Sequence, residues 1–126
     1  MVERGNGVLK RKFESIKYTI DHRKAFIKLE KKLLGYNTLR GYLHDLDKVF
    51  LKIFLSPELT HKIHRSYSKH HARNARTEED YIQMIIDMEC ARFTKPDKPL
   101  NARDTLKAYY PYLVYKLEPL LKKLGL

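Results

Sequence analysis

The apolar residues of this chain recur every three or four positions along nearly its whole length. No stretch alternates apolar and polar residues in the way that a half-buried strand requires. The spacing is clearest from residue 13 to residue 34, where one helical stripe carries Tyr18, His22, Ala25, Phe26, Leu29 and Leu33. Gly35 follows as a stop signal. This periodicity predicts an all-α fold.

Further helices are predicted after Gly35. A segment from about Leu39 to Phe54 has a broad apolar face made of Leu39, Tyr42, Leu43, Leu46, Val49, Phe50 and Ile53. Ser56 and Pro57 have the form of a helix N-cap followed by a first-turn proline, and this helix is expected to run toward His71. Residues 72–76 are expected to form a loop.

The second half of the chain has equally clear helix signals. Thr77 precedes three acidic residues, which is the pattern of a capping hydroxyl followed by a negatively charged first turn. This helix is expected to end near Phe93 and to bury Tyr81, Met84, Ile85 and Met88. Asn101 is predicted to cap another helix, which Pro111 interrupts. A last helical stretch is expected from Tyr112 to Leu124, with a bend near Pro119.

One domain accounts for this organisation. The chain has 126 residues, no internal repeat and no linker long enough to separate two domains. With 43% hydrophobic residues it can bury one core without disulfides. The prediction is a compact single-domain bundle of five or six helices over residues 1–126, in which residues 1–12 form a flexible basic N-terminal segment.

Cysteine content and hydropathy exclude several classes of protein. Cys90 is the only cysteine, so the chain has neither an internal disulfide nor a cysteine-based zinc finger. Its polar start differs from a signal peptide. The longest apolar stretch runs from Val49 to Leu55 and is interrupted by Lys52, far short of the ~20 residues that span a bilayer. The expectation is a cytoplasmic protein, or one of the host cytoplasm if it is viral, without a membrane partner.

The charge of the chain favours an anionic partner. It has 26 Lys and Arg against 15 Asp and Glu, which gives a net charge of +11. A field of this sign concentrates anions, and nucleotides, other phosphorylated molecules and nucleic acids are the common candidates. Many basic domains bind none of these in particular, so charge alone selects no function.

Six histidines, His22, His44, His61, His64, His70 and His71, carry most of the chemical information. His22 lies within an apolar stripe, where an imidazole needs a hydrogen-bond partner. Taken alone, it would be a core histidine bonded to a backbone carbonyl. His44 and Asp45 form a mixed ligand set suited to a divalent metal. Because neighbouring helical residues point about 100° apart, both reach one ion only near a helix end or with help from another helix.

Asp87 is the distal acidic candidate. It lies at the edge of the apolar face of its predicted helix, so its carboxylate is expected to point across the bundle. The alternative is a surface acid paired with Arg92 or with a nearby lysine.

Taken in order, these residues resemble the HD-domain superfamily of metal-dependent phosphohydrolases, whose signature is an H…HD…D series on a helical bundle. The stretch His44-Asp45-Leu46-Asp47-Lys48 is similar to the HD-x-x-K element of that superfamily. The resemblance covers roughly His22 to Arg92. It is closest to a small HD-like group of bacteria and phages that has a His-His-x-x-Asn element, here His70-His71-Ala72-Arg73-Asn74. The interval from Asp45 to Asp87 is 42 residues (87 minus 45), which implies a minimal version of the bundle.

The resemblance implies a metal centre. His22, His44, Asp45 and Asp87 would bind a first ion, and Asp45 would bridge to a second ion held by His64, His70 or His71. The ion or ions would be Mn, Mg, Fe, Ni or Zn. If the third helix continued to its expected end, Leu59, Ile63, Tyr67 and His70 would face inward. A more solvent-facing stripe would then contain His61, His64, Ser68 and His71. His64 and His71 could chelate together, and His61 would be a surface residue.

The same resemblance suggests catalytic and substrate-binding roles. Asp45 or Asp47 would orient the attacking water or take its proton, and Lys48 would act beside them. Lys48, Arg73, Arg92 and Lys95 are candidates for holding phosphate oxygens. For each of these bases the alternative is a solvated surface residue.

Two functions follow from these observations. The first is a metal-dependent phosphohydrolase acting on a nucleotide-like phosphoester, by metal-assisted hydrolysis. The alternative is a non-enzymatic basic helical module that binds nucleic acid or a protein partner and uses its histidines structurally. The acids favour the first, because a pure nucleic-acid binder gains nothing from Asp45 and Asp87 near its basic surface.

Overall fold

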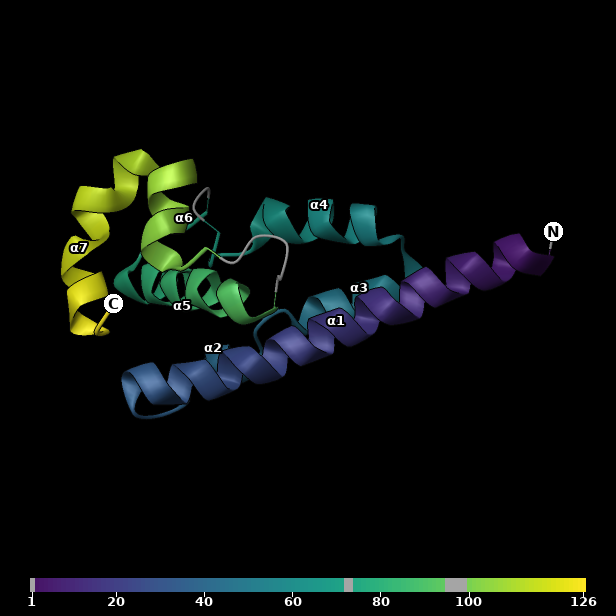
Figure 1. The fold of residues 1–126 in the computed structure, drawn as a ribbon, viewed down its shortest axis with the longest axis horizontal. Coiled ribbons are helices and arrows are strands. Elements are labelled where there is room, and N and C mark those ends of the chain that lie inside the picture. Colours follow the sequence, from purple (N-terminus) through teal and green to yellow (C-terminus); the bar gives the residue numbers. More distant parts are fainter. Residues whose placement is uncertain (1, 72–73, 95–99) are drawn as a thin grey trace.

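The computed structural model describes the backbone of residues 2–71, 74–94 and 100–126, with side chains from Gly7 onward in these ranges. The helices are α1 (Val2–Leu34), α2 (Leu39–Tyr42), α3 (Leu46–Phe54), α4 (Pro57–Tyr67), α5 (Glu78–Thr94), α6 (Ala102–Tyr109), the 3-10 turn η1 (Pro111–Leu113) and α7 (Val114–Lys123) (Figure 1). Six of them have eight residues or more. The described ranges contain no strand, and the all-α prediction is confirmed.

Helix α1 is longer than the sequence predicted. It begins at Val2 instead of residue 13, and its N-terminal end projects beyond the other helices (Figure 1). Contacts from the first half tie α1 to its neighbours, because Lys12 Nζ donates to the Ile53 carbonyl at 2.8 Å and Arg11 pairs with Glu58 at 3.1 Å. Gly35 ends the helix with φ 85°, in the left-handed region that glycine enters without strain.

The single helix predicted over residues 39–54 is wrong. The chain leaves the helical path between Tyr42 and Leu46, so α2 and α3 are separate elements. The break rotates the apolar stripe of α3 away from the bundle, and Phe50 and Ile53 are exposed. Lys52 packs against α1 instead. It is 1% exposed, and its Nζ donates to the Ser15 carbonyl at 2.9 Å and to Thr19 Oγ1 at 2.5 Å.

Helix α4 begins as predicted but ends earlier. Ser56 Oγ accepts from the Leu59 N–H at 3.2 Å and caps the helix, whereas the helix stops at Tyr67 instead of His71. The predicted facing of this helix is wrong for Leu59 and Tyr67, which are exposed, and for His64, which is buried with Thr60 against α3. Ile63 is half-buried. Beyond the helix, His70 is buried as predicted, and Ser68, expected to face solvent, is buried as well.

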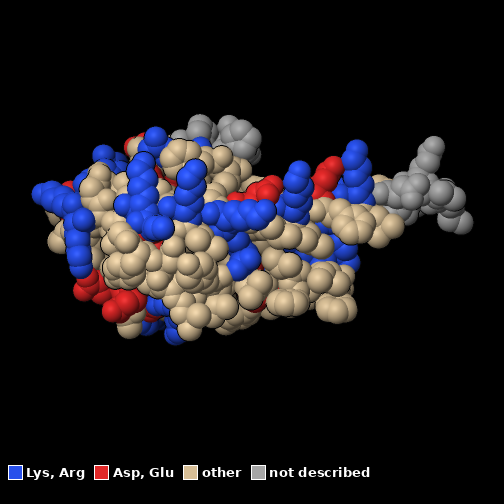
Figure 2. All heavy atoms as spheres, turned by 90° about the horizontal axis from the view of Figure 1, so that it is seen from below, with Lys and Arg blue, Asp and Glu red and all other residues tan. Residues whose placement is uncertain are grey.

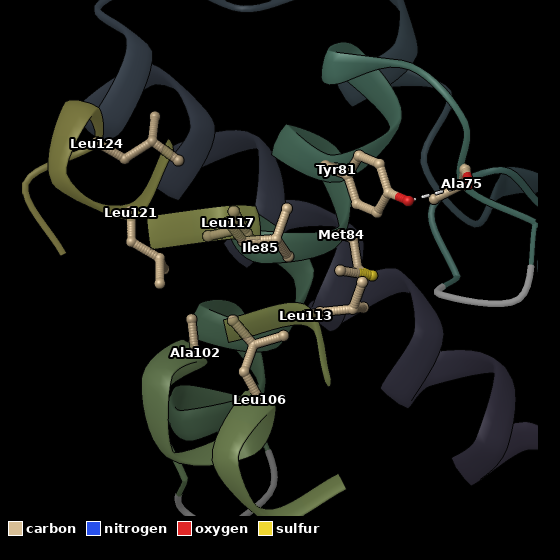
Figure 3. Close-up of a cluster of buried hydrophobic side chains, with 10 residues drawn as sticks. All are labelled: Ala75, Tyr81, Met84, Ile85, Ala102, Leu106, Leu113, Leu117, Leu121 and Leu124. Carbon is tan, nitrogen blue, oxygen red and sulfur yellow. Dashed lines mark hydrogen bonds between the residues drawn. The ribbon is translucent and has the colours of Figure 1, made fainter. Parts of the chain in front are cut away.

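Helix α5 is the centre of the bundle. Thr77 Oγ1 accepts from the Asp80 N–H at 3.1 Å, which confirms the predicted cap. The buried face of α5 meets residues of α6, η1 and α7 in one apolar core, drawn in Figure 3, whose members include Tyr81, Met84, Ile85, Leu106, Leu113, Leu117 and Leu121. Met88 is partly buried against this core. Asn101 caps α6 as predicted, and Pro119 lies inside α7.

A second apolar cluster joins α1 to α5 and supports the candidate site. It consists of Phe26 and Leu29 from α1 and Ile86 and Cys90 from α5. Helix α1 also packs against α3, and α3 packs against α4. The polar groups described below therefore lie among four elements, α1, α3, α4 and α5, of which α1 and α5 are joined by apolar contacts. Among the described residues, no helix has the length and apolar character needed to cross a membrane.

Candidate metal centre

Four side chains from separate parts of the sequence meet beside α5. His22 of α1 and His44 both direct Nε2 at Asp87 Oδ1 of α5, at 2.7 and 3.0 Å. Asp45 Oδ2 lies 3.3 Å from His44 Nε2 and 3.9 Å from His22 Nε2. One nitrogen or oxygen atom from each residue lies within 4.8 Å of the others. The structure thus brings these four residues together, and we call them the first set.

The break between α2 and α3 explains how two neighbouring residues reach one place. On a regular helix the side chains of His44 and Asp45 would point about 100° apart. Asp45 instead has φ 55° and ψ 15°, a left-handed conformation that aspartate adopts more readily than most residues. The turn lets His44 Nε2 and Asp45 Oδ2 approach to 3.3 Å.

Two side chains of α1 anchor this turn. Arg23 Nε donates to the His44 carbonyl at 2.8 Å, and Arg23 Nη2 donates to the Tyr42 carbonyl. Glu30 is completely buried and accepts hydrogen bonds at 2.7–3.1 Å from the Thr38 N–H and hydroxyl, Asn37 Nδ2 and Gln83 Nε2. Glu30 therefore holds the chain just before α2, and Arg23 holds it just after α2, as far as the His44 carbonyl.

A second set of histidines lies on the other side of Asp45. Asp45 Oδ1 is 3.0 Å from His64 Nε2 and 3.2 Å from His70 Nε2, and these two nitrogens are 3.2 Å apart. Neither contact with Asp45 has hydrogen-bond geometry, so Asp45 Oδ1 is a buried acceptor without a hydrogen bond. His71 Nε2 is likewise buried without a partner. His64, His70 and His71 each offer a ring nitrogen within 4.8 Å of the others.

The histidines are oriented from outside the centre. In three of them Nε2 faces the centre and Nδ1 has an outer partner. These partners are Thr94 Oγ1 at 3.2 Å from His22, Asp47 Oδ2 at 2.6 Å from His64 and Ser68 Oγ at 2.9 Å from His70. Of the other two rings, His44 stacks on Phe26 with centroids 3.8 Å apart. Outer partners of this kind fix the tautomer and orientation of metal-binding histidines.

The central carboxylates are ionised in the metal-free protein. Burial alone raises the pKa of Asp45, but its contacts with His64 and His70 outweigh burial and hold the pKa below its usual range. Burial likewise raises the pKa of Asp87, and the neighbouring His44 and the hydrogen bond from His22 lower it well below the usual value. Both groups are thus available as anionic ligands.

The imidazoles divide into two kinds. Burial lowers the pKa of His44, and it lowers the pKa of His71 to about 3, so both rings are neutral at pH 7. Burial also acts to lower the pKa of His22, but the hydrogen bond to Asp87 raises it to about 10. A metal ion that bound His22 Nε2 would have to displace that proton, which makes binding dependent on pH.

These distances fit a metal ion. Ligand atoms about 2.1 Å from one ion are about 3.4 Å apart on a tetrahedron and about 3.0 Å apart on an octahedron. The four contacts described in the first set run from 2.7 to 3.9 Å, and those among Asp45, His64 and His70 run from 3.0 to 3.2 Å. A cation would also satisfy the orphaned Asp45 Oδ1. These buried His and Asp groups could therefore hold a metal ion.

Of His61 and the predicted phosphate-binding bases, one residue contacts the centre. Lys48 belongs to the centre, since its Nζ lies 3.3 Å from Asp45 Oδ2. His61 is exposed. The described contacts of Arg92 are with Glu89 and the Phe93 ring, away from the two sets. Arg73 and Lys95 lie outside the described residues.

His22 and Asp87 do not form the contacts that their alternative interpretations predicted. His22 bonds to the Asp87 carboxylate and the Thr94 hydroxyl through its ring nitrogens, and no ring contact with a backbone carbonyl is among its described hydrogen bonds. Asp87 pairs with the two histidines and not with Arg92. His22 and Asp87 therefore pair with each other, and the surface ion pair that the sequence offered for Asp87 is not formed with Arg92.

Several residues of the centre were missed in the sequence. Thr94 and Ser68 hold ring nitrogens of ligand histidines, and Arg23 holds the turn. Tyr67 donates to Asp47 Oδ2. Its position three residues after His64 was a usable signal, because residues three apart lie on one side of a helix. Thr94 and Arg23 lack such a signal, since tertiary packing alone brings them to the centre.

Comparisons with known protein families, with curated proteins and with solved structures find no match for this chain.

Proposed function

We propose that the protein is a metal-dependent phosphohydrolase with a two-ion centre, acting on a nucleotide-like phosphoester. One observation carries the proposal. The two oxygens of Asp45 face different groups of histidine Nε2 atoms, Oδ2 toward His22 and His44 and Oδ1 toward His64 and His70. A buried carboxylate with imidazole nitrogens at both oxygens is the arrangement expected of a bridging ligand.

The donor set narrows the choice of metal. Four of the six residues in these contacts are histidines, and imidazole suits Zn, Fe and Ni better than Mg, which prefers oxygen ligands and water. We therefore expect Zn²⁺, Fe²⁺ or Ni²⁺ before Mn²⁺ or Mg²⁺. When bound, such an ion lowers the pKa of a water ligand and neutralises charge on a phosphoryl group.

The exposure of the ligands indicates where a substrate approaches. The Asp87 side chain is 22% exposed and that of Lys48 is 14% exposed, whereas that of Asp45 is only 2% exposed. Among the groups in contact with Asp45 and the first set, Asp87 and Lys48 therefore reach solvent. Lys48 is the base best placed to hold a phosphoryl oxygen, because it already contacts an anionic oxygen of the centre.

The surface charge supports an anionic substrate. Figure 2 views the molecule from the side of α1, where Lys and Arg side chains follow the helix. Along α1, exposed lysines recur at seven-residue intervals, at Lys10, Lys17, Lys24 and Lys31. This field, with the net charge of +11, concentrates phosphorylated molecules around the protein.

The alternative is a structural polar core within a basic binding module. It is favoured by the fact that His22, His44 and His64 already contact carboxylates at 3.0 Å or less. In that case the centre would be complete without a metal, and the charge of the surface would serve nucleic acid directly.

Metal analysis and thermal melts separate these functions. We expect metal in purified protein, a lower melting temperature after chelation, and recovery with Zn²⁺, Mn²⁺, Fe²⁺ or Ni²⁺. An ion at a hundredfold excess over its Kd stabilises the folded state by about 2.7 kcal/mol. Asp45→Asn should abolish this recovery, and His61→Ala, at an exposed histidine outside both sets, should retain it.

A panel of nucleotides and other phosphomonoesters and diesters then tests hydrolysis with each metal. Turnover that Asp45→Asn loses and His61→Ala keeps would support the proposal. The alternative would be established by a metal-free protein that binds DNA or RNA with steep salt dependence and whose melting temperature does not change with chelator or metals.

A further inference from the structure

The contact of His64 with Asp47 places a proton on Nδ1 of His64. Asp47 Oδ2 lies 2.6 Å from His64 Nδ1. An ionised carboxylate only accepts hydrogen bonds, so Nδ1 must be the donor. The lone pair that a neutral His64 has left is therefore on Nε2. That nitrogen faces Asp45 Oδ1 at 3.0 Å and His70 Nε2 at 3.2 Å.

Tyr67 completes this contact from the solvent side. Its hydroxyl donates to the same oxygen of Asp47 that accepts from His64. Tyr67 is 50% exposed and belongs to α4, whereas Asp47 belongs to α3. The Tyr67 ring also packs edge-on against His64, with centroids 6.0 Å apart. Asp47 thus has two donors on one oxygen and is held in place across the contact between α3 and α4.

We propose that Asp47 and Tyr67 are positioning residues that hold His64 in its Nδ1–H form and so prepare Nε2 to bind the second metal ion. This inference rests on the proposed two-ion centre. It assigns Asp47 a role different from the one expected from the sequence, in which its carboxylate would activate water. The positioning role also differs from that of a direct metal ligand. Asp47 could be such a ligand by distance, because Asp45, Asp47 and His64 each offer an atom within 4.8 Å of the others.

The affinities of the two ion positions should then depend differently on the outer partners of their histidines. The outer partner of His22 is the neutral hydroxyl of Thr94, and that of His70 is the neutral hydroxyl of Ser68. His64 alone among these three histidines has a carboxylate behind it. A carboxylate partner raises the basicity of a ligand imidazole, so the second position depends on Asp47 for affinity.

The test measures zinc binding and the His64 tautomer on the full chain. Zinc titrations against a competing chelator give the affinity of each ion. Long-range ¹H–¹⁵N spectra of histidine-labelled protein report which ring nitrogen is protonated. We expect Asp47→Ala to weaken the second ion about 10- to 100-fold, to leave the first ion unchanged, and to lose the His64 Nδ1–H signal.

Conservative variants keep the test independent of folding. Asp47→Asn retains an acceptor oxygen, so it should keep the Nδ1–H signal and lose less affinity than Asp47→Ala. Tyr67→Phe removes one hydrogen bond to Asp47 and should weaken the second ion about three- to tenfold. Tyr115→Phe is the matched control, because Tyr115 is 94% exposed and should change nothing.

Each other result has a defined meaning. If wild-type protein binds two ions and Asp47→Ala binds them equally well, the positioning role is wrong while the metal centre stands. If Asp47→Asn abolishes the second ion as fully as Asp47→Ala, Asp47 is a ligand. If Asp47→Asn keeps both ions but loses hydrolysis, Asp47 acts on the attacking water instead. If wild-type protein binds none of Zn²⁺, Fe²⁺, Ni²⁺ and Mn²⁺, the proposed function fails, and an Nδ1–H signal that persists in Asp47→Ala then refutes the positioning role as well.

Discussion

Gly41 provides a sharp test of how the turn before the metal centre is held. It lies in α2, three residues before His44. A Cβ atom added to Gly41 would lie 2.1 Å from Glu30 Oε1 and 2.4 Å from Glu30 Oε2. Contacts this short force one group to move. Glu30 is completely buried, and Asn37, Thr38 and Gln83 hydrogen-bond its carboxylate, so Gly41→Ala must disrupt this network.

The magnitude follows from those hydrogen bonds. Hydrogen bonds to a charged group contribute about 1.5–3 kcal/mol each. Displacing the Glu30 carboxylate far enough to admit a methyl group breaks at least two of them, which costs about 3–6 kcal/mol. Alanine regains about 1 kcal/mol over glycine in a helix. The free energy of unfolding should therefore fall by about 2–5 kcal/mol, a large part of the 5–15 kcal/mol typical of a domain.

Urea denaturation followed by far-UV circular dichroism measures this loss. Gly7→Ala is the control, because a Cβ there meets nothing within 4 Å, and it should stabilise the protein by about 0.5–1 kcal/mol. In Glu30→Ala the carboxylate is absent, so adding Gly41→Ala to that variant should cost far less than in the wild type. A loss below about 1 kcal/mol for Gly41→Ala, or equal losses in both backgrounds, would refute the reasoning.

Two pH dependences follow from buried charges. Burial opposes ionisation of Asp80, but the N–H groups of Arg76 and Thr77 and the Arg40 guanidinium lower its pKa to about 2. The stabilisation from the ionised Asp80 is therefore complete above pH about 4 and lost toward pH 2. In urea denaturation, Asp80→Asn should not show this loss of stability at low pH, and an equal loss in the variant and the wild type would contradict this assignment. Burial lowers the pKa of Lys52 to about 8, so wild-type stability should rise from pH 8 to about 10.4, where only the unfolded state holds this proton. Lys52→Met should lack that rise, and an equal rise in both proteins would exclude this origin.

The sequence was sufficient where a structural signal is local. The caps at Ser56, Thr77 and Asn101 are found at the predicted residues, because each depends on a side chain and a backbone N–H within the same turn. The same holds for Gly35, which ends α1 in the left-handed region. Such contacts need no partner element, so one sequence contains the whole signal.

The sequence was insufficient where packing decides which side of a helix is buried. On α4 the apolar residues Leu59 and Tyr67 seemed the natural inward face, but His64 is 2% exposed and Leu59 is 43% exposed. The inward face of α4 is polar because His64 meets the carboxylates of Asp45 and Asp47. Hydrophobic periodicity therefore assigns the wrong side of a helix where the buried groups are histidines paired with acids.

The break at Asp45 shows how the irregular part of the fold serves the site. Continuing the helix from residue 39 to residue 54 would satisfy the apolar pattern, yet it would separate the side chains of His44 and Asp45 by about 100°. A left-handed residue other than glycine costs about 1–2 kcal/mol, less for aspartate, and Arg23 and Glu30 hold the surrounding turn through buried and half-buried hydrogen bonds. The gain is an Asp45 carboxylate with imidazoles at both oxygens. Local backbone preference and chemistry disagree at this residue, and the fold follows the chemistry.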